Sequence, residues 1–147
     1  MNPLTVCTIG FTRKSLRNFV GLLNQAEVEK VIDIRLRNTS QLAGYSKKDD
    51  LAFVLDLCGI AYEHIQDLAP TEEILNEYHK TKDWQQFEKR FHDLLEGRDP
   101  VTSTVRAASG HATVCLLCTE ETPEKCHRRL VAEYLGARLP DVEVRHL

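Results

Sequence analysis

The chain has 147 residues, of which 42% are hydrophobic and 28% are charged, and its formal net charge is −3. This length suits one domain spanning residues 1–147, and the composition is too apolar and too weakly charged for a disordered chain. The net charge shows no basic bias of the kind that indicates nucleic-acid binding, although the 19 Lys and Arg residues leave a local basic patch open.

Strand and helix patterns alternate along the chain. Runs rich in β-branched residues predict strands, and apolar residues three and four positions apart predict helices. The predicted strands cover residues 4–9, 31–34, 61–65, 112–117 and 142–144. The predicted helices cover residues 15–25, 48–58, 74–80, 83–95, 102–108 and 127–135. The polar stretch between the second strand and the second helix, residues 35–46, is predicted to be a long loop.

This alternation predicts a single-domain α/β fold. Right-handed crossovers between the strands give a mostly parallel sheet, covered by helices in a three-layer sandwich of the Rossmann-like or flavodoxin-like kind. In such open sheets, ligands bind beyond the carboxyl ends of the strands. The residues that follow each strand are therefore the first candidates for a functional site.

The cysteines and the hydropathy pattern indicate a compartment. The number of cysteines, five, is odd, and the chain begins directly with a strand pattern instead of a signal peptide. We therefore expect free thiols in a reducing, cytoplasmic setting. No apolar run approaches the roughly 20 residues that a membrane span needs, so no membrane partner is expected.

Three predicted strands are each followed by residues suited to chemistry or binding. These residues are Gly10 and Thr12 after the first strand, Asp33 and Arg35 after the second, and Cys118 and Glu120 after the fourth. A sheet with a purely structural role does not need a glycine, a carboxylate, a guanidinium and a thiol at one edge. We predict that these residues line a common site.

The densest group of such residues is Cys126-His127-Arg128, where the last long helix begins. The first turn of a helix carries partial positive charge, which favours ionisation of a thiol and binding of an anion. Arg128 is able to grip a phosphate or carboxylate through two hydrogen bonds. Glu120 is suited to orient His127, to act as a base or to pair with Arg128.

Four short segments carry a resemblance to a known family: Thr8-Ile9-Gly10, Asp33-Ile34-Arg35, Leu117-Cys118-Thr119-Glu120 and Cys126-His127-Arg128. In these segments the chain resembles DUF488, a family of bacterial and archaeal domains of unknown function. The likeness extends over nearly the whole chain, and the last two segments are its specific part. The resemblance implies an α/β fold and assigns no reaction.

Structural roles compete with functional ones for several of these residues. Cys115 and Cys118 are three positions apart on a strand, so their side chains face opposite sides and do not suit a redox or zinc pair. Cys7, Cys58 and Cys115 are expected in the core, whereas Cys118 suits either the core or the site. Further alternatives are an ion pair of Asp33 with Arg35, a positive-φ turn at Gly10 and a surface position for His127.

Metal and cofactor binding are not expected. Cys118, Glu120, Cys126 and His127 offer suitable ligand types, but two adjacent ligands at 126 and 127 are awkward for one tetrahedral ion, and no second paired motif supports a site. The nucleotide fingerprint G-x-G-x-x-G does not occur in the sequence.

The leading hypothesis is a cysteine-dependent hydrolase or transferase. Cys126 is predicted as the nucleophile, with Cys118 also in the site, and Glu120, Asp33 or His127 moves protons. The alternative hypothesis is a module that binds a phosphate, a nucleotide or a nucleic acid without turnover. Under both, the partner is a small anionic molecule, held by Arg35, Arg128, Gly10 and Thr12. A third and weaker hypothesis is a purely structural or protein-binding domain.

Overall fold

The central sheet has five parallel strands in the order β3-β2-β4-β1-β5. Their bounds are β1 (Leu4–Gly10), β2 (Lys30–Asp33), β3 (Ala61–His64), β4 (Thr113–Cys118) and β5 (Val142–His146). The structure is a computed structural model that describes residues 3–39 and 41–147. It confirms the predicted α/β class and the parallel sheet. The strand order differs from the usual Rossmann and flavodoxin orders, because β4 lies between β2 and β1.

Helices are present wherever the sequence predicts them. Their bounds are α1 (Leu16–Gln25), α2 (Lys48–Leu57), α3 (Glu72–Thr81), α4 (Trp84–Gly97), α5 (Pro100–Ala107) and α6 (His127–Arg138). Two short 3-10 segments add to them, η1 (Gln41–Ser46) and η2 (Gln66–Leu68), so the prediction of a loop through residue 46 is wrong over η1. In the described part of the chain, the helices are too short or too polar to cross a membrane.

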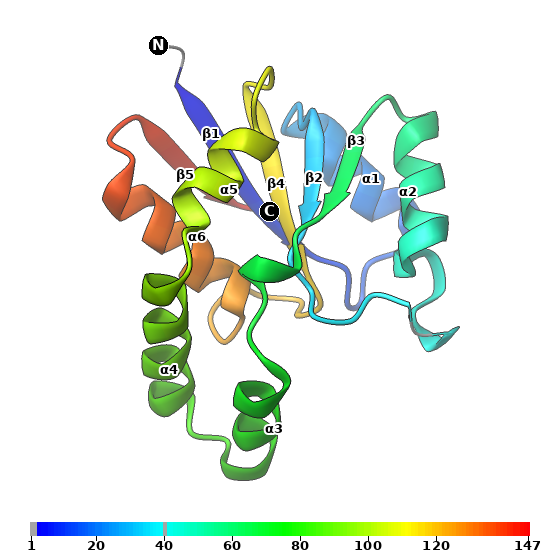
Figure 1. The fold of residues 1–147 in the computed structure, drawn as a ribbon. Coiled ribbons are helices and arrows are strands. Elements are labelled where there is room, and N and C mark those ends of the chain that lie inside the picture. Colours follow the sequence, from blue (N-terminus) through cyan, green and yellow to red (C-terminus); the bar gives the residue numbers. More distant parts are fainter. Residues whose placement is uncertain (1–2, 40) are drawn as a thin grey trace.

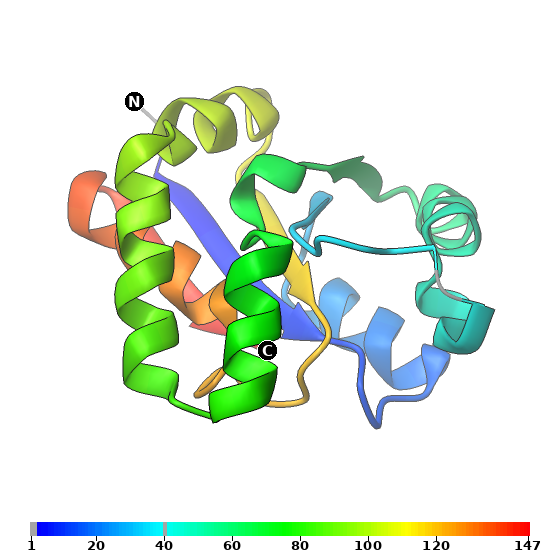
Figure 2. The same ribbon diagram turned by 60° about the horizontal axis from the view of Figure 1, so that its bottom comes forward.

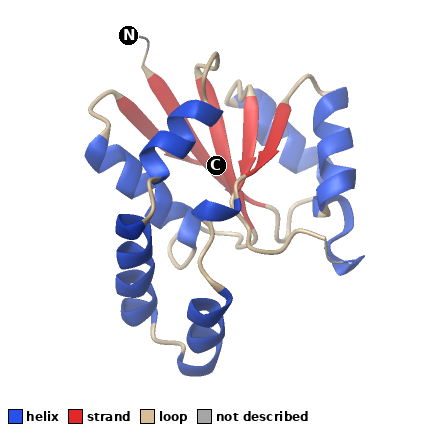
Figure 3. Cartoon of the chain, in the orientation of Figure 1, coloured by secondary structure: helices blue, strands red, loops and turns tan. Residues whose placement is uncertain are grey.

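The direction of the crossovers decides which face each helix covers. The first two crossovers move along the sheet toward β3, and the later ones return toward β5. Since such crossovers are right-handed, α1 and α2 cover one face of the sheet, and α5 and α6 cover the other. Figures 1 and 3 show these two helical layers with the sheet between them.

Each face of the sheet has its own buried apolar cluster. Phe19 of α1 and Leu51 of α2 pack on the side that also holds Cys7 and Cys115. On the opposite side, apolar residues of α4, α5 and α6 pack against Leu116 of β4 and its neighbours. Because alternate strand residues face opposite sides, β4 contributes to both clusters and is the most deeply buried strand.

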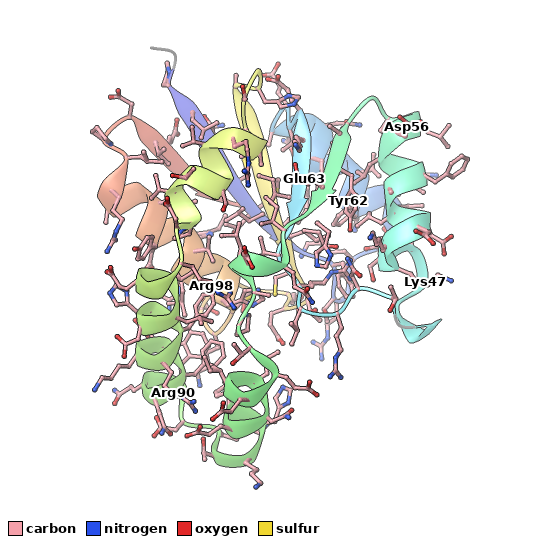
Figure 4. All side chains as sticks on the ribbon, viewed as in Figure 1. Lys47, Asp56, Tyr62, Glu63, Arg90 and Arg98 are labelled. Carbon is pink, nitrogen blue, oxygen red and sulfur yellow. The ribbon has the colours of Figure 1, made fainter. Side chains whose placement is uncertain are left out.

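The α3–α4 pair forms a helical hairpin that extends past the carboxyl end of the sheet (Figures 1 and 2). Aromatic contacts of Tyr78 with Trp84 and Phe87 hold the two helices together. Arg90 of α4 adds ion pairs to Glu73 and Glu77 of α3, while Arg98 at the end of α4 donates to the carbonyl oxygens of Asp67 and Ala69 (Figure 4 labels both arginines). The hairpin is thereby tied to the segment that follows β3.

Most of the helices start in the way the sequence suggests. The side chains of Ser15, Thr71, Asp83 and Asp99 each accept a hydrogen bond from a backbone N–H in the first turn of the following helix. Helices α2 and α6 differ, because the side chains of their N-cap residues, Lys47 and Cys126, make no such bond. The backbone N–H groups at the start of α6 therefore lack the usual side-chain cap.

Candidate functional site

A cavity of about 380 Å³ lies between the carboxyl ends of β2 and β4 and the α3–α4 hairpin. These two strands are neighbours whose following crossovers run to opposite faces, which is where open α/β sheets bind ligands. The lining combines apolar side chains of the hairpin, three cations, two carboxylates, and two thiols with an imidazole. In that order these residues are Leu75, Tyr78, Trp84 and Phe87; Arg35, Arg37 and Lys125; Glu72 and Glu120; and Cys118, Cys126 and His127. Arg37 and Glu72 form an ion pair with each other.

The centre of the site is a contact between a thiol and an imidazole. Cys118 ends β4 and His127 begins α6, and Cys118 Sγ lies 3.3 Å from His127 Nδ1. The other ring nitrogen, Nε2, lies 2.7 Å from the backbone carbonyl oxygen of Ile34. Because a carbonyl oxygen only accepts hydrogen bonds, Nε2 carries the hydrogen in the neutral ring and Nδ1 is the unprotonated nitrogen. Cys118 Sγ also lies 3.8 Å from Nε2, so the sulfur sits over the ring, closer to Nδ1. The ring also packs edge-on against Phe91.

A hydrogen bond between the two thiols of the site separates their pKa values. Burial raises the pKa of Cys118, but the hydrogen bond from the Cys126 thiol and that from the backbone N–H of Thr119 outweigh it, and the net pKa is lowered. The bond to Cys118 raises the pKa of Cys126, and burial raises it further. Cys118 is therefore the more acidic of the two thiols, whereas the sequence analysis predicted Cys126 as the nucleophile.

The other three cysteines lie away from the cavity. Cys7 and Cys115 are fully buried in the sheet, as predicted. The core position predicted for Cys58 is wrong, since this residue is exposed. It is the C-cap of α2, one position past the helix, so its side chain leaves the apolar stripe.

Asp33 and Arg35 form a buried ion pair behind the cavity. Arg35 donates from Nε and Nη2 to the two carboxylate oxygens over 2.9 and 2.8 Å, and the Tyr62 hydroxyl donates to Oδ2 over 2.6 Å. Asn38 adds a further bond, and Figure 4 labels Tyr62 on β3. Burial raises the pKa of Asp33, but the bonds and charge of Arg35 outweigh this effect and hold it below its usual value. These contacts favour the structural alternative for Asp33, while Arg35 lines the cavity.

Arg128 points into the protein and does not join the side chains that line the cavity in the described part of the chain. It is fully buried, and it donates to the backbone carbonyl oxygens of Glu120 and Glu121. A Cβ atom at Gly10 would overlap both the Glu120 carbonyl and the Arg128 guanidinium. Gly10 is thus required for close packing and does not have the positive φ considered above. Both residues shape the loop after β4 and do not contact the cavity.

Thr12 and Glu120 lie in the loops that follow β1 and β4. Thr12 donates to the carbonyl oxygen of Thr119 through its hydroxyl, over 2.6 Å, and through its backbone N–H, over 3.1 Å. It therefore ties the loop after β1 to the loop after β4. Glu120 lines the cavity, but the group that orients His127 is the Ile34 carbonyl.

One set of side chains offers ligands for a metal ion. Cys118, Cys126 and His127 each bring one donor atom, and these atoms all lie within 4.8 Å of one another. All three residues are buried and line the cavity. The sequence predicts no metal site here, yet the folded chain brings these two thiols and the imidazole close together.

Sequence reasoning missed two parts of the site. The first is the aromatic wall: the helical spacing of Trp84 and Phe87 marks one face of a helix, but it does not show which part of the sheet that face covers. The second is the Ile34 carbonyl, a backbone group with no signature in the sequence. Each depends on the placement of one element against another.

Comparisons with known proteins agree with the resemblance seen in the sequence. Neither the curated proteins nor the solved structures give a significant match to the chain. A family model described as "Domain of unknown function DUF488" matches residues 15–135, a range that contains the second, third and fourth strands, the α3–α4 hairpin and all three potential metal ligands. The chain belongs to the DUF488 family.

Proposed function

We propose that the protein is a cysteine-dependent enzyme, a hydrolase or a transferase, that acts on a small anionic substrate. Cys118 is the nucleophile, and His127 is the base that accepts its proton. The observation that carries this proposal is the 3.3 Å contact between Cys118 Sγ and His127 Nδ1, with Nε2 held by the Ile34 carbonyl. Covalent catalysis needs this arrangement of a nucleophile, a base within reach and a third group that orients the base.

The reaction has two steps. In the first, the Cys118 proton passes to His127 Nδ1, and sulfur forms a bond to an electrophilic carbon or phosphorus atom of the substrate. The leaving group departs with its bonding electron pair and takes the proton from Nδ1. In the second step, water or another hydroxyl acceptor gives a proton to Nδ1 and displaces the sulfur, to which His127 returns the proton. Water as the acceptor makes the enzyme a hydrolase, and any other acceptor makes it a transferase.

The surroundings of Cys118 support recognition of an anion. Arg35 and Lys125 line the same cavity. Asp33 and Ser46 fix Nε and Nη2 of Arg35, so a substrate in the cavity would meet Nη1. The N-terminus of α6, which lacks a side-chain cap, adds backbone donors.

The hairpin wall supports a more specific substrate class. Tyr78, Trp84 and Phe87 present aromatic surface to the cavity, on the side opposite the strand ends. A substrate with both a flat apolar part and an anionic part would use both sides of the cavity. We therefore propose a nucleotide or another phosphorylated compound, in a cytoplasmic setting that keeps the free thiols reduced.

The test of this proposal is selective alkylation of the folded, metal-free protein. With chelator and reductant present, iodoacetamide should modify Cys118 about tenfold faster than the fully buried Cys115, as mapped by mass spectrometry. His127→Gln should slow the reaction of Cys118 while the melting temperature stays close to that of the wild type. Equal modification rates for Cys118 and Cys115 in the folded protein would contradict the proposal.

A binding module without turnover is the second candidate, and the uncapped start of α6 beside Lys125 favours it. It predicts that phosphate or nucleotides raise the melting temperature and that Cys118→Ser leaves this increase unchanged. The enzyme predicts instead that Cys118→Ser abolishes turnover in a screen of phosphorylated compounds. The two candidates thus differ in the response to one substitution.

A further inference from the structure

Three soft donor atoms meet at the cavity, and their spacing suits a metal ion. The thiols of Cys118 and Cys126 and one nitrogen of His127 lie within 4.8 Å of one another. A tetrahedral zinc ion with ordinary Zn–S and Zn–N bonds holds its ligand atoms about 3.6–3.8 Å apart. The Cys118 Sγ to His127 Nδ1 distance of 3.3 Å is already close to that spacing. Small side-chain rotations would complete the geometry.

The helix boundary removes the difficulty of adjacent ligands. Cys126 is the N-cap of α6, with φ −134° and ψ 138°, and its backbone is extended, whereas His127 is the first residue of the helix. The change of backbone direction between them turns both side chains toward Cys118. The sequence alone gives no position for this boundary to within one residue.

The imidazole is held as metal-binding histidines usually are. His127 Nε2 bonds to the Ile34 carbonyl, which leaves Nδ1 as the donor atom for a metal. Histidine ligands in metal sites commonly give their second ring N–H to a carbonyl or a carboxylate, which fixes the tautomer and the ring orientation. Here the backbone carbonyl directly after β2 supplies that outer contact, and a rotation of the Cys118 side chain relative to the ring would bring its sulfur into the coordination sphere.

We propose that Cys118, Cys126 and His127 form a three-ligand site for Zn²⁺, with the fourth coordination position open to the cavity. Two thiolates and an imidazole select zinc over magnesium or calcium, which prefer oxygen ligands. Three protein ligands with one open position are typical of catalytic zinc, whereas structural zinc takes four protein ligands. A water molecule or an anionic group of a ligand would occupy the fourth position.

This inference goes beyond the proposed thiol chemistry and does not depend on it. Zinc binding replaces the thiol protons of Cys118 and Cys126 and occupies the lone pair of His127 Nδ1. The metal-bound protein therefore has no nucleophilic thiol at the cavity. Zinc would block the thiol reaction reversibly, and removal of the metal would restore it.

The test is a titration of the chelator-treated, reduced protein with Co²⁺, followed by displacement with Zn²⁺. One equivalent of Co²⁺ should produce the visible absorption of tetrahedral, thiolate-bound cobalt, and Zn²⁺ should abolish it. Cys118→Ser and Cys126→Ser should each weaken zinc binding by more than about 100-fold, since loss of an outer contact alone costs about 10–100-fold. Cys58→Ser, at an exposed position, is the matched control and should bind like the wild type.

A second measurement uses the wild-type protein and needs no substitution. One equivalent of Zn²⁺ should protect Cys118 from iodoacetamide and leave the exposed Cys58 reactive. Absence of both the cobalt spectrum and this protection would overturn the zinc site, as would tight binding that both Cys→Ser variants retain. A metal-free protein with a reactive Cys118 and no zinc binding would leave the proposed enzyme standing. If the protein binds zinc but Cys118 of the metal-free protein is unreactive, the zinc site stands and the proposed enzyme fails.

Discussion

Cys7 and Cys115 lie opposite each other on β1 and β4 and are fully buried, whereas Cys118 and Cys126 lie where β4 leads into α6 and are 5% and 2% exposed. The two pairs are thus buried to nearly the same degree. Burial raises the pKa of Cys7 and of Cys115, but at Cys118 the hydrogen-bond donors outweigh the same effect and lower it. The polar groups around a buried sulfur therefore decide the direction in which its pKa shifts, and exposure does not distinguish the two pairs.

The same contrast extends to charge. The interior of the sheet is mostly apolar, while the buried charged side chains of the described residues lie at or beyond the carboxyl ends of the strands: Asp33, Arg35 and Arg128. Asp33 and Arg35 pair with each other, and Arg128 donates from Nη1 and Nη2 to backbone carbonyl oxygens, while its buried Nε has no hydrogen-bond partner among the described residues. Removing one partner of a buried charged pair at the strand ends should therefore lower the stability of the fold strongly, because the other charge stays buried without its partner.

Asp33→Ala should give the largest effect on stability. It leaves the Arg35 guanidinium, only 4% exposed, without its carboxylate, and we expect the free energy of unfolding to fall by about 3–5 kcal/mol. Urea denaturation of the variant measures the loss. The double variant Asp33→Ala/Arg35→Met should lose less, because it removes the unpaired charge. A double variant less stable than the single one would contradict the claim that the unpaired charge of Arg35 causes the loss of stability.

Gly10→Ala should give the next largest effect. The added Cβ meets the Glu120 carbonyl and the Arg128 guanidinium, so we expect a loss of about 2–3 kcal/mol from overpacking. Gly21→Ala is the matched control, because its Cβ meets no atom within 4 Å and the residue lies within α1. That control should be more stable than the wild type by about 0.5–1 kcal/mol. In thermal unfolding, a lower melting temperature for Gly10→Ala together with a higher one for Gly21→Ala would show that close packing requires glycine at position 10. Glycine flexibility alone would not produce this difference.

Acid should weaken the strand ends before it affects the apolar interior. The pKa of Asp33 is lower in the folded protein than in the unfolded chain, where it is about 3.9. The stabilisation from Asp33 is therefore fully present above the unfolded pKa and is lost as the pH falls through the folded pKa. The urea midpoint of the wild type should exceed that of Asp33→Asn at pH 7, and this difference should shrink as the pH is lowered to 3. A constant difference between the two proteins over that range would contradict the lowered pKa of Asp33 in the folded protein.

The sequence predicts the elements and the edge of the sheet at which the site lies, because both depend on local periodicity and on the general behaviour of parallel sheets. It places Cys118, Glu120, Cys126 and His127 near one another, and the structure brings all four to one cavity. The resemblance to the family is also visible in the sequence, and the family model covers three of the four segments that carry it, all but Thr8-Ile9-Gly10.

The sequence does not predict which of these side chains face the cavity and which support it. Arg128 follows His127 directly, yet one helical step turns its guanidinium into the protein, toward the Glu120 carbonyl. The choice between Cys118 and Cys126 as the thiolate depends on hydrogen bonds across a helix boundary. The hairpin wall depends on how α3 and α4 pack beyond the sheet. All three are properties of tertiary placement, which residue spacing alone does not determine.

The smallest expected effect on stability tests the contrast between the thiol pairs directly. Cys115→Ala removes a fully buried sulfur from the interior and should cost about 1 kcal/mol, while iodoacetamide modifies Cys118 at the wild-type rate. Cys118→Ala should abolish the fast modification, and Cys126, which loses its hydrogen-bond partner, should not replace it as the reactive thiol. Denaturation and mass-spectrometric mapping on the same samples give both quantities. If Cys115→Ala slowed the modification of Cys118, the two pairs would be coupled through β4, and the separation between an inert interior and a reactive strand end would fail.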